Sequence, residues 1–320
     1  AAYKQNWEKI ASVFRDGGLV KGKVKSVVKG GLMVNVGVEA FLPASQVDIV
    51  PPRNLQAFVG NTYEFKVVKI NQKDHAQGHI APNVVAWLAK GPAGLAQEAA
   101  LRGAAATGEQ ADFYRAVEIT MAGVQDFLQR YADLAERLAA NAEPADAADL
   151  REVAAIARRL AFHPAGTFHE AIQSLWMLFV VLHTESNASS FSPGRLDVAL
   201  QPYYETGIAD GSLSPERALE LIECLFLKFN QIVYLRNAHS ARYFAGFPIG
   251  FNIAVGGQDA HGGDVANDLS FLFLQAQKHL GLPQPNLSVR LHPGTDDALL
   301  KQAVRVVARG SGMPQFFNDA

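Results

Sequence analysis

Two different periods of hydrophobic residues divide the chain. Up to about residue 70, apolar and polar residues alternate, as they do in strands that are buried on one face only. Glycine-containing turns separate the predicted strands. The pattern predicts a short amphipathic helix at 3–14, followed by strands at 19–28, 32–36, 38–43 and 63–70. Short strands at this spacing are typical of a small all-β barrel.

Farther along the chain, apolar residues recur every three or four positions, which predicts helices. The expected helices are at 83–101, 108–141, 146–162, 167–185 and 215–234. Ser214, Pro215 and Glu216 are typical of a helix start. Short apolar strands then alternate with helices: strands at 252–255, 286–292 and 314–317, helices at 264–280 and 296–309. This alternation favours a parallel sheet or an α/β barrel.

The junction between the two patterns predicts two domains, residues 1–73 and 74–320. A chain of 320 residues is long enough for two hydrophobic cores. The segment QKDHAQGHIAPN, at 72–83, lacks strand alternation, and Pro82 leads into a helix. The small barrel is therefore predicted to lack its closing strand. Its neighbouring strands would keep unpaired backbone groups, so we expect marginal stability.

Charge is distributed unevenly between the two predicted domains. Lysine and arginine exceed aspartate and glutamate by 6 up to Lys73, which leaves −8 for the rest of the chain. A basic small module beside an acidic large one suggests a polyanionic partner for the small module. The alternative is a solvated basic face that has no partner.

Composition excludes some classes of protein. No apolar run approaches the ~18 residues that a membrane-spanning helix needs; the densest runs only from Leu175 to Leu182. The chain opens with no signal peptide. A single cysteine, Cys224, excludes an internal disulfide framework and is typical of a reducing compartment. We expect a cytoplasmic protein without a membrane partner.

The first module contains LVKGKVKSVVKGGLMVNVGVEAFLPASQVD and VGNTYEFKVVKIN, which resemble the OB-fold repeat of bacterial ribosomal protein S-one. The resemblance implies that aromatic rings stack on RNA bases while cations hold phosphates. Met33 and Pro43 depart from the family's usual stacking aromatic and histidine, and the FLP-S form is more similar to repeats that dock on the ribosome. The residues expected to contact RNA are Lys23, Lys25, Lys29 and Phe41.

The second module resembles the glycyl radical enzymes, the superfamily of pyruvate formate-lyase. The similar segments are GHIAPN, ALELIECLFLKFNQI, FAGFPIGFNIAVGGQD, LPQPNLSVRLHPGT, GSGMPQFFND and the long run that begins AGTFHEAIQSLW. The SPGR and PQPNLSVR forms favour the dehydratase-like branch. The resemblance implies an α-rich α/β portion of a ten-stranded barrel that cleaves a C–O, C–N or C–C bond in a small polar substrate.

The same resemblance implies radical chemistry. A separate iron–sulfur activase installs a backbone glycyl radical, and a cysteine on a central loop passes it to the substrate. Both groups lie downstream of the family's MPQFFND motif, so we expect no catalytic residue, no bound cofactor and no activity in these 320 residues. Cys224 has apolar residues three and four positions away and is predicted to be a buried structural thiol.

The dehydratase-like branch also implies a substrate pocket. The residues expected to bind substrate are His79, Ser186, Asn187, Ser190 and Ser192, although a helix contact is the simpler role for the histidine. Ala188 and Ser189 replace the family's usual Gly-His, which leaves the substrate open.

Two further polar pairs have simpler roles. Arg195 and Asp197 are predicted to form a structural ion pair rather than to act in catalysis. His163 and His169 lack further ligands at a metal-binding spacing, so no metal site is predicted.

Three hypotheses about function and origin follow. The chain is an incomplete glycyl radical enzyme, which when complete would have a radical activase as a partner and could form a homodimer. Alternatively, it is an RNA- or ribosome-binding protein that acts through its first module. The third hypothesis treats the chain as a chimera of two unrelated coding fragments, joined between Lys73 and Gly78.

Overall fold

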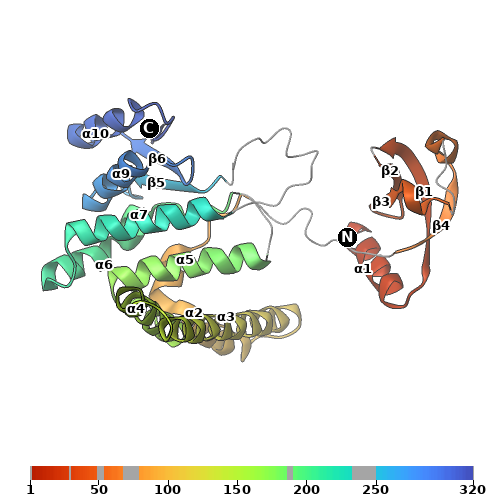
Figure 1. Cartoon of the computed structure of the whole chain (residues 1–320), viewed down its shortest axis with the longest axis horizontal. Helices are drawn as coiled ribbons and strands as arrows, with labels where there is room; N and C mark the ends of the chain where they lie inside the picture. Colours follow the sequence, from red (N-terminus) through yellow and green to blue (C-terminus); the bar gives the residue numbers. More distant parts are fainter. Residues whose placement is uncertain are drawn as a thin grey trace. The chain divides into compact units, whose positions relative to one another are not determined.

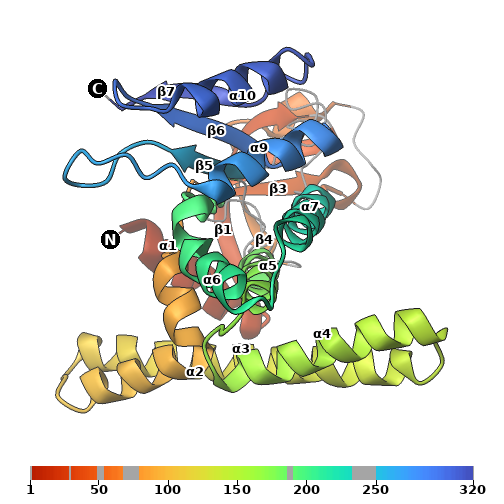
Figure 2. The ribbon, with the colours of Figure 1, turned by 90° about the vertical axis from the view of Figure 1, so that its left-hand side faces the viewer.

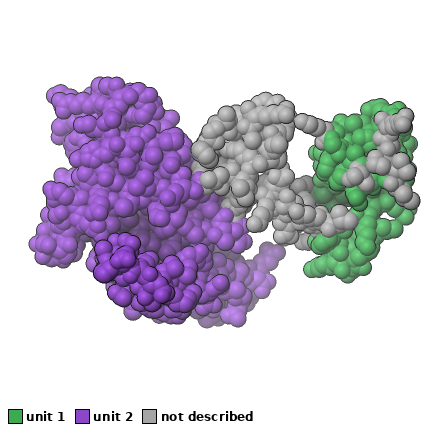
Figure 3. Space-filling model, in the orientation of Figure 1, with its two compact units in different colours: residues 1–74 green, residues 75–320 purple. Residues whose placement is uncertain are grey.

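The computed structural model describes residues 2–28, 30–48, 54–67, 79–185, 190–232 and 250–319. The chain forms two compact units, residues 1–74 and 75–320 (Figure 3). Within the described ranges, no helix combines the length and the apolar character needed to cross a membrane.

The smaller unit is a curled antiparallel sheet preceded by helix α1 (Ala2–Arg15) (Figure 1). Its strand order is β3-β2-β1-β4. The strands are β1 (Leu19–Val28), β2 (Gly31–Asn35), β3 (Glu39–Pro43) and β4 (Thr62–Lys66), with short 3₁₀ helices η1 (Ala44–Gln46) and η2 (Leu55–Phe58). The predicted OB-type fold is confirmed. The absence of a closing strand was predicted for residues 72–83, and 72–78 lie outside the described residues. The described end of the segment contains a single bridge, which joins Ile80 to Phe191 of the larger unit.

The alternation in β1 explains how this sheet makes a core. Val24 packs with Leu32 and Val34 of β2, and all three are at most 2% exposed. Gly22 lies on the same inner face, where an added Cβ would come within 2.6 Å of the Val36 side chain. A glycine here lets the neighbouring strands approach closely enough for the sheet to curl.

The larger unit is mostly helical in its described part. Its helices are α2 (Val84–Gly103), α3 (Glu109–Ala139), α4 (Pro144–Phe162), α5 (Phe168–Glu185), α6 (Leu196–Asp210), α7 (Pro215–Gln231), α9 (Asp268–Leu280) and α10 (Asp297–Val307). The helix start predicted at Ser214 is confirmed, because its side chain accepts a hydrogen bond from the Arg217 N–H. Helix α6 was not predicted.

Helices α3 and α4 form a long antiparallel hairpin (Figure 2). Ala132 and Ala135 of α3 meet Ala154 and Ala157 of α4 in a small core of their own. Small side chains let the two helices approach closely. Arg158 of α4 reinforces the contact with a 2.9 Å hydrogen bond to the Asp133 carboxylate.

Three parallel strands form the sheet of the larger unit, in the order β5-β6-β7, and helices α6 and α9 pack against β5. Their bounds are β5 (Asn252–Gly256), β6 (Asn286–Leu291) and β7 (Gln315–Asn318). Two parallel bridges, Gly194 to Ile253 and Ile80 to Phe191, extend the row with two more segments. Five parallel segments in a row form one wall of an α/β barrel, as predicted.

The two faces of this wall differ in polarity. Ile253 and Val255 of β5 and Leu287 and Val289 of β6 point to one face, and all four are 0% exposed. They are buried in the main core, which also includes residues of α9 and α10 (Figure 2). The polar residues of the strands, Asn252, Ser288 and Arg290, occupy the opposite face.

Asp197 at the start of α6 fixes the end of β5. Its side chain is 0% exposed and accepts hydrogen bonds from the Gly256 N–H (2.7 Å), the Ser270 hydroxyl (2.6 Å) and the Val198 N–H (2.8 Å). Burial raises the pKa of the carboxyl group, and these three hydrogen bonds oppose the rise. One carboxylate thereby joins α6, β5 and α9.

Arg195 binds the same strand end through backbone carbonyls, and its charge also lowers the pKa of the Asp197 carboxyl. Its guanidinium donates to the Gly256 carbonyl at 2.7 Å and to the Gln258 carbonyl at 2.8 Å. No ion pair joins Arg195 to Asp197 in the described part of the chain, so the predicted pairing is wrong. Both side chains instead hold backbone groups in place.

We predict that Asp197→Ala destabilises the larger unit by about 3 kcal/mol, because it leaves buried donors without an acceptor. Urea unfolding followed by far-UV circular dichroism, to which the helices of this unit contribute most, measures the change. Glu205→Ala on the exposed side of the same helix is the matched control and should cost less than about 0.5 kcal/mol. Equal effects of the two substitutions would contradict the role of Asp197.

Candidate functional site

The polar face of the parallel sheet carries a connected set of side chains. The Ser288 hydroxyl of β6 donates a 2.8 Å hydrogen bond to the Asn252 side-chain oxygen of β5. Two residues along β6, Arg290 donates from Nε to the Asp319 carboxylate at 2.7 Å. These groups satisfy one another, so they form a stable polar wall rather than a set of free ligands.

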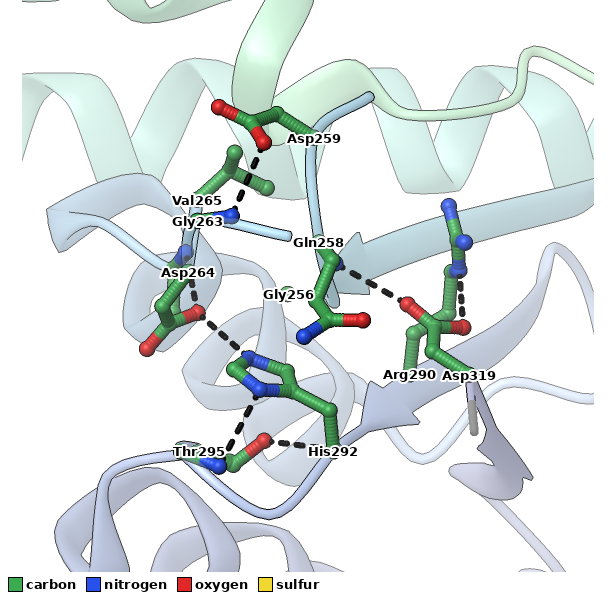
Figure 4. Close-up of polar contacts among 12 residues, drawn as sticks. Gly256, Gln258, Asp259, Gly263, Asp264, Val265, Arg290, His292, Thr295 and Asp319 are labelled. Carbon is green, nitrogen blue, oxygen red and sulfur yellow. Dashed lines mark hydrogen bonds and ion pairs between the residues drawn. The ribbon is translucent and has the colours of Figure 1, made fainter. Parts of the chain in front are cut away.

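The carboxyl ends of the strands meet at Asp319 (Figure 4). Its second oxygen accepts a 2.9 Å hydrogen bond from the Gln258 N–H, which follows β5. Burial raises the pKa of the Asp319 carboxyl, but Arg290 and the Gln258 N–H together outweigh that effect and hold it below the usual value. Gly257 lies so near that an added Cβ would be 2.5 Å from the carboxylate. Only glycine fits there.

A second contact joins the loops that follow β5 and β6 (Figure 4). His292 Nδ1 accepts a 3.1 Å hydrogen bond from the Gly294 N–H, which leaves the ring proton on Nε2. That nitrogen lies 3.3 Å from the Asp264 carboxylate. The His292 side chain is 3% exposed, so the pair serves to hold the loops together.

His79 and Ser190 are brought together at the edge of the parallel wall that is opposite β7. Ile80 and Phe191 pair in a parallel bridge, so the residues before them, His79 and Ser190, are neighbours. The Ser192 N–H donates a hydrogen bond to the Ile80 carbonyl at 2.9 Å. Both His79 (φ 58°) and Ser190 (φ 64°) adopt the left-handed backbone conformation, the only non-glycine residues to do so in the described part. Such conformations cost energy and cluster at functional sites.

The side chains of His79 and Ser190 form no hydrogen bond within the described residues, and neither is buried. Ser192 is half-buried beside them. Ser186 and Asn187, also predicted to bind substrate, lie outside the described residues. The described part of the predicted set therefore lies in one place and offers unoccupied polar groups.

Sequence analysis missed Asn252, Ser288 and Arg290 as parts of the site. Their signal is the strict alternation in NIAVG and NLSVRL, where every second residue is polar or small. The alternation shows that these strands have one polar face. Asp319 and Gln258 carry no such signal, because their contact depends on tertiary structure.

Cys224 lies elsewhere, on α7, and its side chain is exposed. The prediction of a buried thiol is therefore wrong. The buried face of α7 is formed by Leu221, Ile222, Leu225 and Phe226, which points Cys224 outward. Partial desolvation and the nearby Glu220 raise the pKa of the thiol, so it is a poor source of thiolate.

The smaller unit presents a basic face on the outer side of β1. Lys23 and Lys25 alternate with buried residues and are exposed, and Lys25 lies 3.6 Å from Glu39 of β3. Phe41 pairs with Met33 across β2 and β3, and is 54% exposed. Three of the four predicted RNA contacts thus share a face, whereas Lys29 lies outside the described residues.

Within the described ranges, no group of three or more histidine, cysteine, aspartate or glutamate residues is placed to bind a metal ion.

Comparison with known proteins separates the same two parts. Residues 13–77 match the S1 RNA binding domain, and residues 52–320 match the family model described as pyruvate formate lyase-like. The overlap of the two matches covers the junction between the units.

The relatives of the larger unit are dehydratases and other glycyl radical enzymes. A probable dehydratase of Escherichia coli, YbiW, is 34% identical over 256 residues, which cover 75% of this chain and 31% of the relative. The structure of a Roseburia inulinivorans protein titled for 1,2-propanediol dehydration aligns with a TM-score of 0.73 at 36% identity, covering 76% of this chain and 30% of that one. A glycyl radical enzyme from Archaeoglobus fulgidus aligns with a TM-score of 0.72 at 30% identity, covering 76% and 32%.

The chain therefore spans about a third of the length of the relatives that it matches. The residues that match them include the parallel wall, the strained pair His79 and Ser190, and the Arg195–Asp197 segment that fixes β5. The expected resemblance is confirmed on both sides of the junction. The chain has an S1 RNA binding domain in its N-terminal part, and it belongs to the pyruvate formate lyase-like family.

Proposed function

We propose that residues 75–320 form a substrate-binding wall of a radical dehydratase or lyase, which cleaves a C–O, C–N or C–C bond of a small polar substrate. The observation that carries the proposal is the adjacent pair His79 and Ser190, both with left-handed backbone and both with unoccupied side chains. A histidine nitrogen and a serine hydroxyl can each donate and accept hydrogen bonds, as binding of a substrate hydroxyl requires.

The surrounding structure supports binding at this place rather than elsewhere on the sheet. The apolar face is closed by helices, and Ser288 and Arg290 on the polar face already have partners. Ser192 lies next to the pair, and we include Ser186 and Asn187, which precede Ser190 in the sequence, in the proposed site. Recognition of a ligand therefore falls to the side chains that have no internal partner.

The thiol of this chain does not fit the radical chemistry of the family. A thiyl radical must form beside the substrate, but Cys224, the single cysteine of the 320 residues, lies on the exposed side of α7. We therefore assign no step of the reaction to residues of this chain. We expect these residues to bind substrate without turning it over, and we propose a radical activase as a partner.

Binding of 1,2-propanediol and glycerol to the full chain tests the proposal. Loss of one hydrogen bond costs about 1 kcal/mol, so Ser190→Ala and His79→Ala should each weaken binding about five- to tenfold. Isothermal titration calorimetry, or ligand-observed NMR where binding is weak, measures the constants. Ser311→Ala in the exposed turn after α10 is the control and should bind as the parent does.

The proposed site would be refuted if both polyols bound the two variants as tightly as the parent. Absence of polyol binding together with binding of another small polar compound, lost in the same variants, would keep the site and change the substrate.

We also propose that the smaller unit binds single-stranded RNA. The specific observation is that Lys23 and Lys25 share the outer face of the sheet with the exposed ring of Phe41. Lys29 would extend this set of cations. A base can stack on the ring while ammonium groups contact the adjacent phosphates. The ion pair of Lys25 with Glu39 reduces the free positive charge, so we expect modest affinity.

Fluorescence anisotropy with a labelled oligouridylate tests RNA binding by the full chain. Phe41→Ala should weaken binding about tenfold or more through loss of stacking. Lys23→Gln should lower the slope of log K against log salt by about 0.7. Lys9→Gln on α1 is the control for general charge. A Phe41→Ala chain that binds as well as the parent, or no binding at low salt, would rule out this proposal.

A further inference from the structure

The polar face of the parallel wall carries two amide side chains that are held in place through their oxygens. Asn252 of β5 and Asn286 of β6 are directly paired in the register of the two strands. The Ser288 hydroxyl donates a hydrogen bond to Oδ1 of Asn252 at 2.8 Å. Nε2 of Gln284 donates to Oδ1 of Asn286 at 3.1 Å. The oxygen of each amide therefore already has a donor from within the protein.

The nitrogen of each amide is left as a donor. A side-chain amide has two N–H groups in addition to its oxygen. Nδ2 of Asn252 and Nδ2 of Asn286 form no hydrogen bond with the described residues, and both side chains are partly exposed. Neighbouring strands lie about 4.8 Å apart, so the two amides are close enough for one small group to contact both. We call Asn252 and Asn286 together the amide pair.

The amide pair lies near the proposed site of His79 and Ser190. A Cβ added at Gly250 would be 2.7 Å from the Ser190 hydroxyl oxygen, so that hydroxyl lies directly against Gly250. Gly250 precedes Asn252 by two residues, and two residues of chain span at most about 7 Å. One small molecule can therefore place a hydroxyl at Ser190 and a second group at the amide pair.

The chemistry of the amide pair indicates which second group it would bind. Its free atoms are donors only, and they match a group that offers only acceptors. A carboxylate is such a group, because its ionised oxygens accept several hydrogen bonds and have no proton to donate. Hydrogen bonds to an ionised acceptor are also the stronger kind. A hydroxyl matches less well, since its own proton needs an acceptor and both Oδ1 atoms already have a donor.

The two strands that carry the amide pair also favour an anion. Neither β5 nor β6 contains an acidic residue. Ala254 and Ser288 follow the amide pair on the polar face and are uncharged. Arg290 comes next on β6, and its charge is balanced by Asp319. A carboxylate at the amide pair therefore meets no unpaired negative charge from these strands.

We propose that the amide pair binds the carboxylate of a small hydroxy acid, while His79 and Ser190 bind its hydroxyl. The inference rests on the proposed substrate site, and it narrows the ligand of that site from small polar compounds in general to hydroxy acids. It also gives the free amide nitrogens of the wall a role that folding alone does not require.

Matched compounds that differ in a single group test the proposal. Glycerate is glycerol with one terminal hydroxymethyl group replaced by a carboxylate, and lactate is related to 1,2-propanediol in the same way. The full chain should bind each acid about tenfold more tightly than the corresponding polyol, because hydrogen bonds to a charged acceptor are about twice as strong. Isothermal titration calorimetry at about pH 7, where both acids are ionised, measures the constants.

Asn252→Asp and Asn286→Asp test the donors without removing the internal hydrogen bonds. Aspartate keeps an oxygen that accepts from Ser288 or Gln284, but it replaces the free N–H groups with an ionised oxygen. Each variant should bind glycerate about ten- to hundredfold more weakly than the parent, and glycerol about as tightly, since a hydroxyl can donate to the new carboxylate. Asn141→Asp, the same change at an exposed position after α3, is the control and should leave both affinities unchanged.

The outcomes separate this inference from the proposed site. Glycerate binding no tighter than glycerol binding would overturn the inference, and so would aspartate variants that keep the circular dichroism of the parent and bind glycerate as tightly. If Ser190→Ala still weakened polyol binding in that case, the proposed site would stand without the amide pair. Absence of binding by all four compounds would overturn the inference as well.

Discussion

The buried carboxylate of Asp197 is the contact on which the ordered site depends. A carboxylate buried in the core must be hydrogen-bonded within the protein. Asp197 accepts hydrogen bonds from the end of strand β5, from the start of helix α9 and from its own helix α6. Because Gly256 is held from one side by Asp197 and from the other by Arg195, the path of the chain after β5 is fixed. The polar wall begins at that fixed point.

From the end of β5, a row of hydrogen bonds leads across the sheet through the Asp319 carboxylate. Gln258 donates to Asp319, and Asp319 in turn orients Arg290. Each step needs a residue without bulk beside it, which Gly257 supplies. The wall thus combines charged side chains with hydrogen bonds that link them to one another and to the backbone. Such links make a polar network rigid.

The sequence predicted the elements better than their connections. Periodicity located the amphipathic helices and the strands of the described residues, and most of these elements bury one regular set of residues. Strand β7 is the exception, because all four of its residues are exposed. Helix α6 escaped detection because Pro202 and Gly207 interrupt its pattern and its buried residues follow no clear stripe. The partners of Asp197 lie 59 and 73 positions away, so no local pattern could have shown them. Cys224 was misplaced because its apolar neighbours belong to the adjacent face of α7.

The same reasoning separates structural from functional polar residues on the wall. Arg290 and Asp319 hold each other, and Ser288 is held by Asn252, so a ligand would have to break existing bonds to reach them. His79 and Ser190 adopt a costly backbone conformation and form no side-chain hydrogen bond with the described residues that would offset the cost. Strain without an internal partner is a disadvantage for folding alone. Its persistence is best explained by a ligand, and this contrast with the satisfied residues favours the pair as the place where substrate binds.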